Sequence, residues 1–189
     1  RIMYIHVPAA YIAVLCYAIM AITSACYLIF RYALADICAR CCAQIGACFT
    51  VLCLITGSLW GKPMWGTWWV WDARLTSVLV LFFIYCGYIA LAQNLKAQHN
   101  QKQLLAILAI IGAINLPIIK FSVDWWNTLH QPASLLRADG PSLHRDFLVP
   151  LLWMLAGFSC LFFWQLLVAV ENTILGQKLQ QMRMRWIEE

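Results

Sequence analysis

The chain has 189 residues, of which 63% are hydrophobic and only 11% are charged, and its formal net charge is +5. A soluble globular domain cannot bury so much apolar surface, so the composition excludes a soluble protein and indicates an integral membrane protein. We expect the membrane as a partner and no nucleic acid.

Five apolar runs are long enough to cross a membrane, at residues 9–30, 42–60, 75–93, 103–123 and 147–170. A helix of about 20 residues spans a hydrocarbon core of roughly 30 Å, and apolarity that is continuous rather than alternating favours helices. The sequence therefore predicts an all-α polytopic membrane helix bundle with five visible transmembrane helices, in one domain over residues 1–189. Because the first residue is Arg1 rather than Met, we expect an upstream piece.

Five crossings place residues 1–8, the loop 61–74 and the loop 124–146 on one side, which we call the tryptophan face. The opposite face holds residues 31–41, 94–102 and the tail after 171. The tryptophan face carries five Lys and Arg residues and the opposite face seven. The positive-inside rule thus predicts that both loops of the tryptophan face are extracytoplasmic.

Three of the four histidines lie on the tryptophan face. His6 stands just before the first span, where Pro8 is predicted to open the helix; His130 follows a tryptophan pair, and His144 precedes the fifth span. A histidine at a membrane boundary is commonly only a hydrated polar residue. Two imidazoles with a tryptophan-rich loop between them nevertheless match the axial ligands and flat apolar walls that a haem needs.

The stretch MWGTWWVWDARLT, residues 64–76, places four tryptophans within seven residues. Anchoring at the membrane interface explains a single tryptophan better than four together. Arg74 and Arg1 suit the carboxylates of a ligand such as haem propionates. Asp72 is predicted either to orient Arg74 or an indole N–H, or to cap the helix of the third span. These residues predict an extracytoplasmic site for a flat ligand, but they do not identify haem uniquely.

Polar residues inside the spans are few. Asn115 and Pro117 interrupt the fourth span, which indicates a kink with a hydrogen-bonded amide or, alternatively, a group that lines the ligand site. The nine cysteines lie in or beside spans. Cys38 and Cys41 have CxxC spacing without a second pair or a following His, so packing is favoured over redox or metal chemistry.

Longer motifs carry a family resemblance. The stretches RIMYIHVPAA, GSLWGKPMWGTWWVWDARLTS and INLPIIKFSVDWWNTLHQPAS resemble the CcmC family, the haem exporter protein C of cytochrome c maturation, with its tryptophan-rich WWD signature. The resemblance implies six spans, so that the first is missing here. It also implies haem b, held non-covalently and transiently at the outer face by His6 and His130 as axial ligands of the iron.

The same resemblance implies partners and a location. Haem passes to a haem chaperone, and a small membrane subunit and ABC-transporter subunits associate with the protein. The expected location is the bacterial inner membrane with the site facing the periplasm, the mitochondrial inner membrane being the alternative. A haem-handling protein rather than an enzyme is implied, with a lyase-like role in the transfer left open. His144 is interpreted as a surface residue. The predicted haem-binding residues are His6, His130, Trp60, Trp65, Trp68, Trp69, Trp71, Asp72, Arg74, Arg1, Trp125 and Trp126.

Three other functions are considered. A membrane cytochrome that carries electrons needs histidines inside its spans, and the predicted spans contain none. A transporter that moves haem across the bilayer needs a polar path, whereas Asn115 is the main polar residue at depth. A scaffold subunit whose tryptophan loop docks a partner protein stays open, because tryptophan is favoured at interfaces. The scaffold predicts that activity survives replacement of both His6 and His130.

Overall fold

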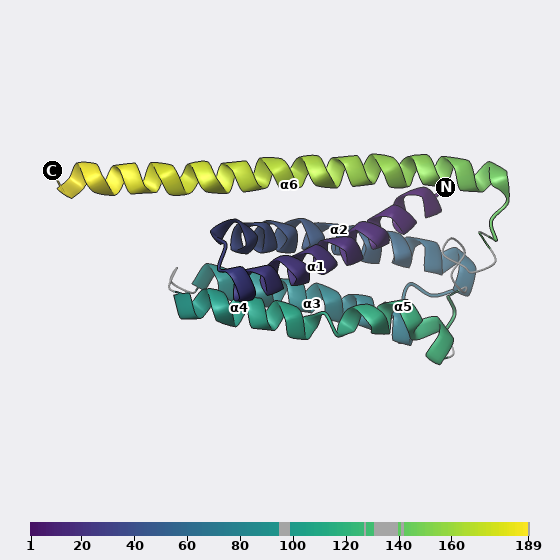
Figure 1. The fold of residues 1–189 in the computed structure, drawn as a ribbon. Coiled ribbons are helices and arrows are strands. Elements are labelled where there is room, and N and C mark those ends of the chain that lie inside the picture. Colours follow the sequence, from purple (N-terminus) through teal and green to yellow (C-terminus); the bar gives the residue numbers. More distant parts are fainter. Residues whose placement is uncertain (95–98, 127, 131–139, 141, 189) are drawn as a thin grey trace.

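The computed structural model describes residues 1–94, 99–126, 128–130, 140 and 142–188 (Figure 1). Its helices are α1 (Met3–Phe30), α2 (Ala33–Trp65), α3 (Ala73–Asn94), α4 (His99–Gly112), α5 (Asn115–Trp125) and α6 (Arg145–Glu188). In the described part of the chain, five helical segments are long and apolar enough to cross a membrane, with α4 and α5 together forming one over Asn100–Trp125. Each contains one predicted span, so the predicted all-α membrane bundle is confirmed.

Helix α1 occupies the middle of the bundle and packs against α2, α4 and α6, while α3 packs against α2 and α5. The buried side of α1 includes Ile12, Cys16 and Tyr17. Polar contacts join the helices where burial would otherwise leave groups without partners. The Tyr85 hydroxyl of α3, for example, donates to the Ala13 carbonyl of α1 at 2.8 Å. Helices α1, α2 and α3 therefore form one packed unit.

The fourth span is broken between Gly112 and Asn115. Pro117 has no N–H to donate to the Ala113 carbonyl, and the Leu116 N–H takes that acceptor instead at 3.0 Å. The buried Asn115 amide donates to the Ser77 carbonyl of α3 at 2.9 Å. The predicted kink with a hydrogen-bonded amide is therefore confirmed.

Three helix boundaries differ from the sequence prediction. Pro8 lies inside α1, so the prediction that it opens the helix is wrong. A proline near the helix start removes few intrahelical bonds, and the preceding turn is retained as His6 packs on α2. Helix α2 continues to Trp65, and Gly66 terminates it with a φ of 78°, a conformation that suits glycine. Of the predicted loop 61–74, only residues 66–72 are therefore outside a helix. Helix α6 continues beyond residue 170 to Glu188.

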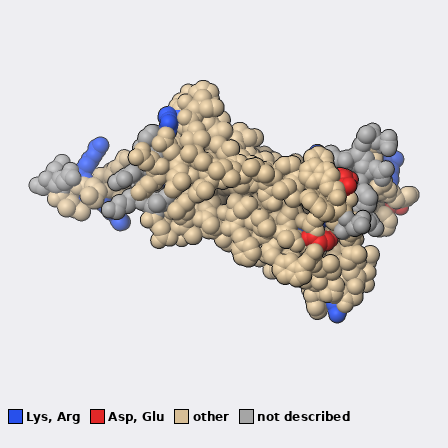
Figure 2. Space-filling model, turned by 90° about the horizontal axis from the view of Figure 1, so that it is seen from below, with Lys and Arg blue, Asp and Glu red and all other residues tan. Residues whose placement is uncertain are grey.

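Charged side chains lie toward the two ends of the molecule on the face shown in Figure 2, with a wide uncharged zone between them. On the membrane side opposite the tryptophan face, the buried Asp36 carboxylate pairs with Arg40 at 3.1 Å and with Lys102 at 3.5 Å. These pairs tie α2 to α4. The uncharged zone is the part that a hydrocarbon core would cover.

Candidate functional site

His6 projects from the first turn of α1 toward α2. Its Nδ1 lies 3.1 Å from the Cys53 carbonyl oxygen and 3.1 Å from the Thr56 hydroxyl. Because a carbonyl can only accept, Nδ1 carries the proton and Nε2 keeps its lone pair. Gly57 makes this approach feasible, since a Cβ at that position would meet the His6 Cε1 atom at 3.1 Å.

Trp60 completes the wall beside His6. The two ring centroids are 5.7 Å apart and the rings meet edge to face. Cys53, Thr56, Gly57 and Trp60 are spaced as neighbours on one side of a helix. One face of α2 therefore positions the imidazole and its aromatic neighbour together.

His130 lies after α5 and is held from a different segment. Its Nδ1 is 3.3 Å from the Asp72 Oδ2 atom, while Asp72 Oδ1 accepts from the Leu75 N–H at 2.7 Å. Asp72 thus caps α3, as one of the two sequence interpretations predicts, and orients His130, which the sequence does not predict. Trp65 meets the His130 ring edge to face with the centroids 5.0 Å apart.

The same environment sets the protonation of His130. Burial lowers the pKa of the imidazole below its ordinary value, while the hydrogen bond and the charge of Asp72 act in the opposite direction. A neutral imidazole is the form that coordinates a metal. With Nδ1–H directed at the carboxylate, Nε2 is again the nitrogen with the free lone pair.

Both imidazoles stand against α2, although they are far apart in the sequence. Each has its Nδ1 engaged and its own tryptophan from α2, Trp60 for His6 and Trp65 for His130. A second hydrogen bond at Nδ1 fixes the orientation and the tautomer of histidines that bind metals through Nε2. Two imidazoles of this kind would suit the iron of a haem, which takes histidine nitrogens as ligands.

Trp60 and Trp65 contact the two histidines, and four other tryptophans of the predicted set are exposed. Trp68 and Trp71 are 55% and 77% exposed, and Trp125 and Trp126 are 58% and 52% exposed. Trp69 is half-buried, and its indole N–H has no hydrogen-bond partner among the described residues. A buried donor without a partner is costly, and a carboxylate of a bound ligand would satisfy it. Exposed indoles and an N–H without a partner suit a flat ligand with acidic substituents.

The predicted cations differ in their surroundings. Arg74 donates to the Ile119 and Lys120 carbonyl oxygens at 3.5 and 3.3 Å and to the Ser122 hydroxyl at 3.3 Å, so its guanidinium links α3 to α5. Arg1 is exposed at the start of the chain. His144 is an exposed residue beside Asp146. Arg1 is therefore the more accessible of the two predicted propionate partners.

Comparison with known proteins identifies the family. The heme exporter protein C family matches residues 1–185 of the chain. The chain belongs to the heme exporter protein C family, CcmC. It is 52% identical over 184 residues to a heme exporter protein C of Bradyrhizobium diazoefficiens, covering 97% of this chain and 70% of the relative. It is 44% identical over 189 residues to that of Escherichia coli, covering 100% of this chain and 75% of the relative.

A mitochondrial relative is similar as well. A putative cytochrome c biosynthesis ccmC-like mitochondrial protein of Marchantia polymorpha is 51% identical over 158 residues, covering 84% of this chain and 66% of the relative. This CcmC chain is therefore a multi-pass membrane protein of a cytochrome c biogenesis family with bacterial and mitochondrial members, and it spans two thirds to three quarters of these relatives.

Sequence reasoning missed the residues of this CcmC chain that hold His6. Cys53 is interpreted together with the other cysteines as a packing residue, and neither Thr56 nor Gly57 is singled out. Their spacing with Trp60 at 53, 56, 57 and 60 is a helical face that ends at the tryptophan-rich segment. That periodicity is the signal that would have found them.

Proposed function

We propose that this chain binds haem at the tryptophan face, between Nε2 of His6 and Nε2 of His130, and delivers it to a haem chaperone for cytochrome c maturation. The observation that carries the proposal is the shared arrangement of the two histidines. Each has its Nδ1 bound to an acceptor, its Nε2 free, and an α2 tryptophan against its ring.

Delivery requires binding that is firm but reversible. Two imidazole ligands hold haem b through coordination bonds alone, so no covalent bond has to be broken on release. The exposed indoles of Trp68 and Trp71 would cover a porphyrin face and stay accessible to a docking chaperone. In this proposal haem is the cargo of the protein. A lyase-like activity of the protein would act during transfer, when the haem becomes attached to the chaperone.

The propionates are proposed to be bound by the polar groups of the same face. Arg1 offers an exposed guanidinium, and Trp69 offers an indole N–H that has no partner among the described residues. Arg74 is the second proposed cation, acting from its position against α5. Two carboxylates with separate donors would fix the rotation of the porphyrin between the histidines.

The proposed setting is a haem export system. The tryptophan face would lie in the periplasm of a bacterial inner membrane, or on the outer side of a mitochondrial inner membrane, in association with a small membrane subunit and ABC-transporter subunits. The positive-inside rule supports this orientation, because the opposite face carries more Lys and Arg.

The proposal is tested by cytochrome c assembly in cells that lack their own copy of the protein. His6→Ala and His130→Ala are expected to abolish assembly, whereas His144→Ala is expected to retain it. His144 is the matched control because it is an exposed histidine near the same face. Assembly that survives the double replacement of His6 and His130 would sink the haem proposal in favour of a docking scaffold.

A further inference from the structure

A small cavity lies between α2 and α3, toward the side of the membrane opposite the tryptophan face. It has a volume of about 120 Å³, which is room for a few ordered waters or one small anionic group. Its wall consists of one cation, three other polar side chains and two apolar ones, namely Arg40, Gln44, Tyr88, Gln93, Ile89 and Ala92. The cavity is therefore mainly polar, although both of its helices are membrane spans.

The position of the cavity along the two helices sets its depth in the membrane. Arg40 lies near the start of α2 at Ala33, and Gln93 is the residue before the end of α3 at Asn94. The apolar runs of these helices begin at residue 42 and end at residue 93. The cavity thus lies where the hydrocarbon gives way to the lipid headgroups, on the side that the positive-inside rule predicts to be cytoplasmic.

The guanidinium of Arg40 is held from one side only. Its Nε atom donates to the Asp36 Oδ1 atom at 3.1 Å, and its two terminal nitrogens bond no residue that the structure describes. The Lys102 ammonium lies 3.5 Å from the other Asp36 oxygen, so two cations share one carboxylate and a net charge of +1 is left over. A guanidinium has five N–H donors, of which this pairing uses one. Asp36 therefore orients Arg40 and leaves charge and donors for another anion.

Tyr88 supplies a second donor, from the α3 side of the cavity. This residue is only 4% exposed and lines the cavity, yet its hydroxyl has no hydrogen-bond partner in the described part of the chain. A buried hydroxyl without a partner is costly, and an acceptor inside the cavity would remove that cost. The amides of Gln44 and Gln93 add further N–H donors to the wall. Donors from both helices therefore line the same space.

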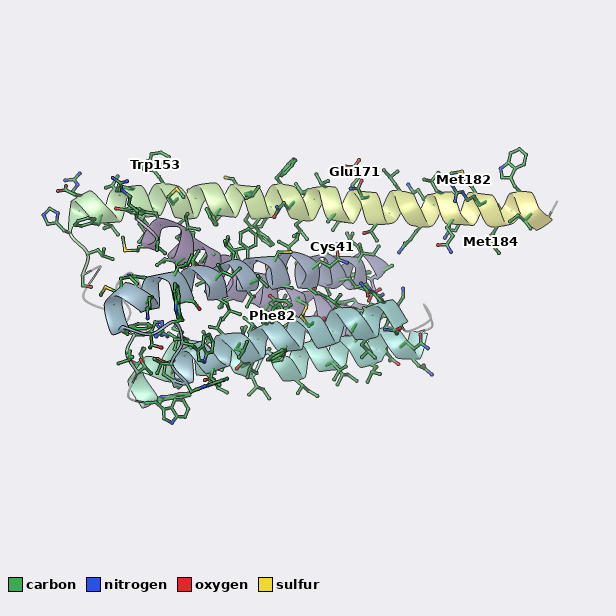
Figure 3. The ribbon with its side chains drawn as sticks, turned by 180° about the vertical axis from the view of Figure 1, so that it is seen from behind. Cys41, Phe82, Trp153, Glu171, Met182 and Met184 are labelled. Carbon is green, nitrogen blue, oxygen red and sulfur yellow. The ribbon has the colours of Figure 1, made fainter. Side chains whose placement is uncertain are left out.

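The other acidic residues that the structure describes lie away from this cavity. Glu171 of α6 points away from the bundle (Figure 3), and Glu188 is the last residue of the same helix. The remaining ones belong to the tryptophan face, namely Asp72, Asp124 and Asp146. Within the described residues, the charge left over by Arg40 and Lys102 is therefore not offset by a second carboxylate, and the cavity suits an anion.

The donors of the cavity suit a phosphate group in particular. A phosphate carries several acceptor oxygens, and it takes two N–H groups of one guanidinium side by side. The Tyr88 hydroxyl and the amides can bond its remaining oxygens. Phosphate groups are abundant at this depth, because basic pockets between membrane helices on the cytoplasmic side bind the headgroups of anionic lipids. The apolar Ile89 and Ala92 would then contact the adjoining carbon atoms.

We infer that the cavity between α2 and α3 binds one phosphate group, with Arg40 as its cationic ligand and Tyr88 as a hydrogen-bond donor. The phosphate group belongs to a phospholipid headgroup or to a soluble phosphate, which present the same oxygens to these donors. When bound, it links α2 to α3 at the side of the membrane opposite the tryptophan face. The inference is independent of the proposed haem binding, because it involves neither the tryptophan face nor the two histidines.

Titration calorimetry of the delipidated full-length protein in detergent tests the inference with two probes, inorganic phosphate and the short-chain lipid dihexanoylphosphatidylglycerol. Arg40→Gln is expected to raise the Kd of the bound probe by about 10- to 100-fold, since charge-assisted hydrogen bonds are lost. Arg183→Gln is the matched control, because it removes an exposed arginine of the same face. Tighter binding of the lipid assigns the site to a headgroup, and tighter binding of inorganic phosphate assigns it to a soluble phosphate. If neither probe binds, or if the two variants have equal Kd values, the inference is overturned.

Tyr88→Phe supplies a second variant that keeps the ring and its packing. Loss of one neutral hydrogen bond is expected to raise the Kd of the same probe by roughly 2- to 12-fold. Tyr32→Phe is the control, since Tyr32 is 65% exposed near the same face and stacks on Phe30 through its ring alone. Equal Kd values for these two tyrosine variants would show that the phosphate group does not reach the cavity, and would also overturn the inference.

Discussion

The two site histidines are held in different ways. His6 belongs to a long helix and bonds neutral groups of one neighbouring helix, the Cys53 carbonyl and the Thr56 hydroxyl. His130 belongs to the connection between α5 and α6 and bonds a carboxylate, Asp72, from the connection between α2 and α3. The first ligand is fixed by helix packing, and the second depends on contact between two segments outside the helices.

This difference predicts different contributions to haem handling. A carboxylate at Nδ1 raises the basicity of a metal-binding imidazole more than a neutral acceptor does. Movement of either connection would withdraw His130, whereas withdrawing His6 would require α1 to separate from α2. We therefore expect His6 to be the permanent ligand and His130 the ligand that is released on delivery.

Removal of Asp72 is expected to have the largest effect on this arrangement. Asp72→Ala removes both the partner of His130 and the cap of α3, and haem affinity should fall by about 10- to 100-fold. Asp72→Asn retains a helix cap and a hydrogen-bond acceptor, so its haem affinity should fall less. Haem titration of the purified protein measures both. Asp146→Ala, an exposed carboxylate beside His144, is the control, and an Asp72→Ala affinity equal to that of this control would contradict the account.

Crowding of His6 is expected to have the next largest effect. Gly57→Leu would place a side chain where the His6 ring lies, so that haem affinity should fall by about tenfold. Gly87→Leu is the matched control, because a Cβ at that glycine of α3 meets nothing within 4 Å. Haem titration again decides, and equal affinities for the two variants would show that the position of His6 does not matter.

Loss of a neutral partner is expected to have the smallest effect. Thr56→Val removes one of the two acceptors near His6 Nδ1 and leaves the Cys53 carbonyl, so affinity should fall by roughly 2- to 12-fold, the equivalent of about 0.5–1.5 kcal/mol. Thr23→Val is the control, since Thr23 bonds only carbonyls of its own helix. If Thr56→Val lost more haem affinity than Asp72→Ala, the proposed difference between the two histidines would be reversed.

The spans were predictable from the sequence because length and apolarity alone decide which segments can cross a membrane. Helix ends were less predictable. Pro8 suggested where the first helix begins, but α1 begins at Met3. The charges after residue 170 end the apolar span, whereas helix α6 continues to Glu188. A charge excludes a residue from hydrocarbon, yet it does not stop an exposed helix.

The site was predictable in its composition but not in its pairing. The clustered tryptophans and the two histidines can be found in the sequence, because their number on one face exceeds what interface anchoring needs. The contact between Asp72 and His130 joins residues 58 positions apart. No local pattern encodes it, and only the packing of α3 against α5 brings the two segments together.

The coordination of the iron tests the central claim most directly. Absorption and electron paramagnetic resonance spectra of the full-length protein, loaded with haem, are compared for wild type and for the His6→Gly, His130→Gly and His144→Gly variants. We expect a low-spin spectrum with two imidazole ligands that is lost in the first two variants, restored by added imidazole, and retained in the third. Low-spin spectra that are unchanged in both the His6→Gly and the His130→Gly variants would contradict the assignment of these residues as the axial ligands.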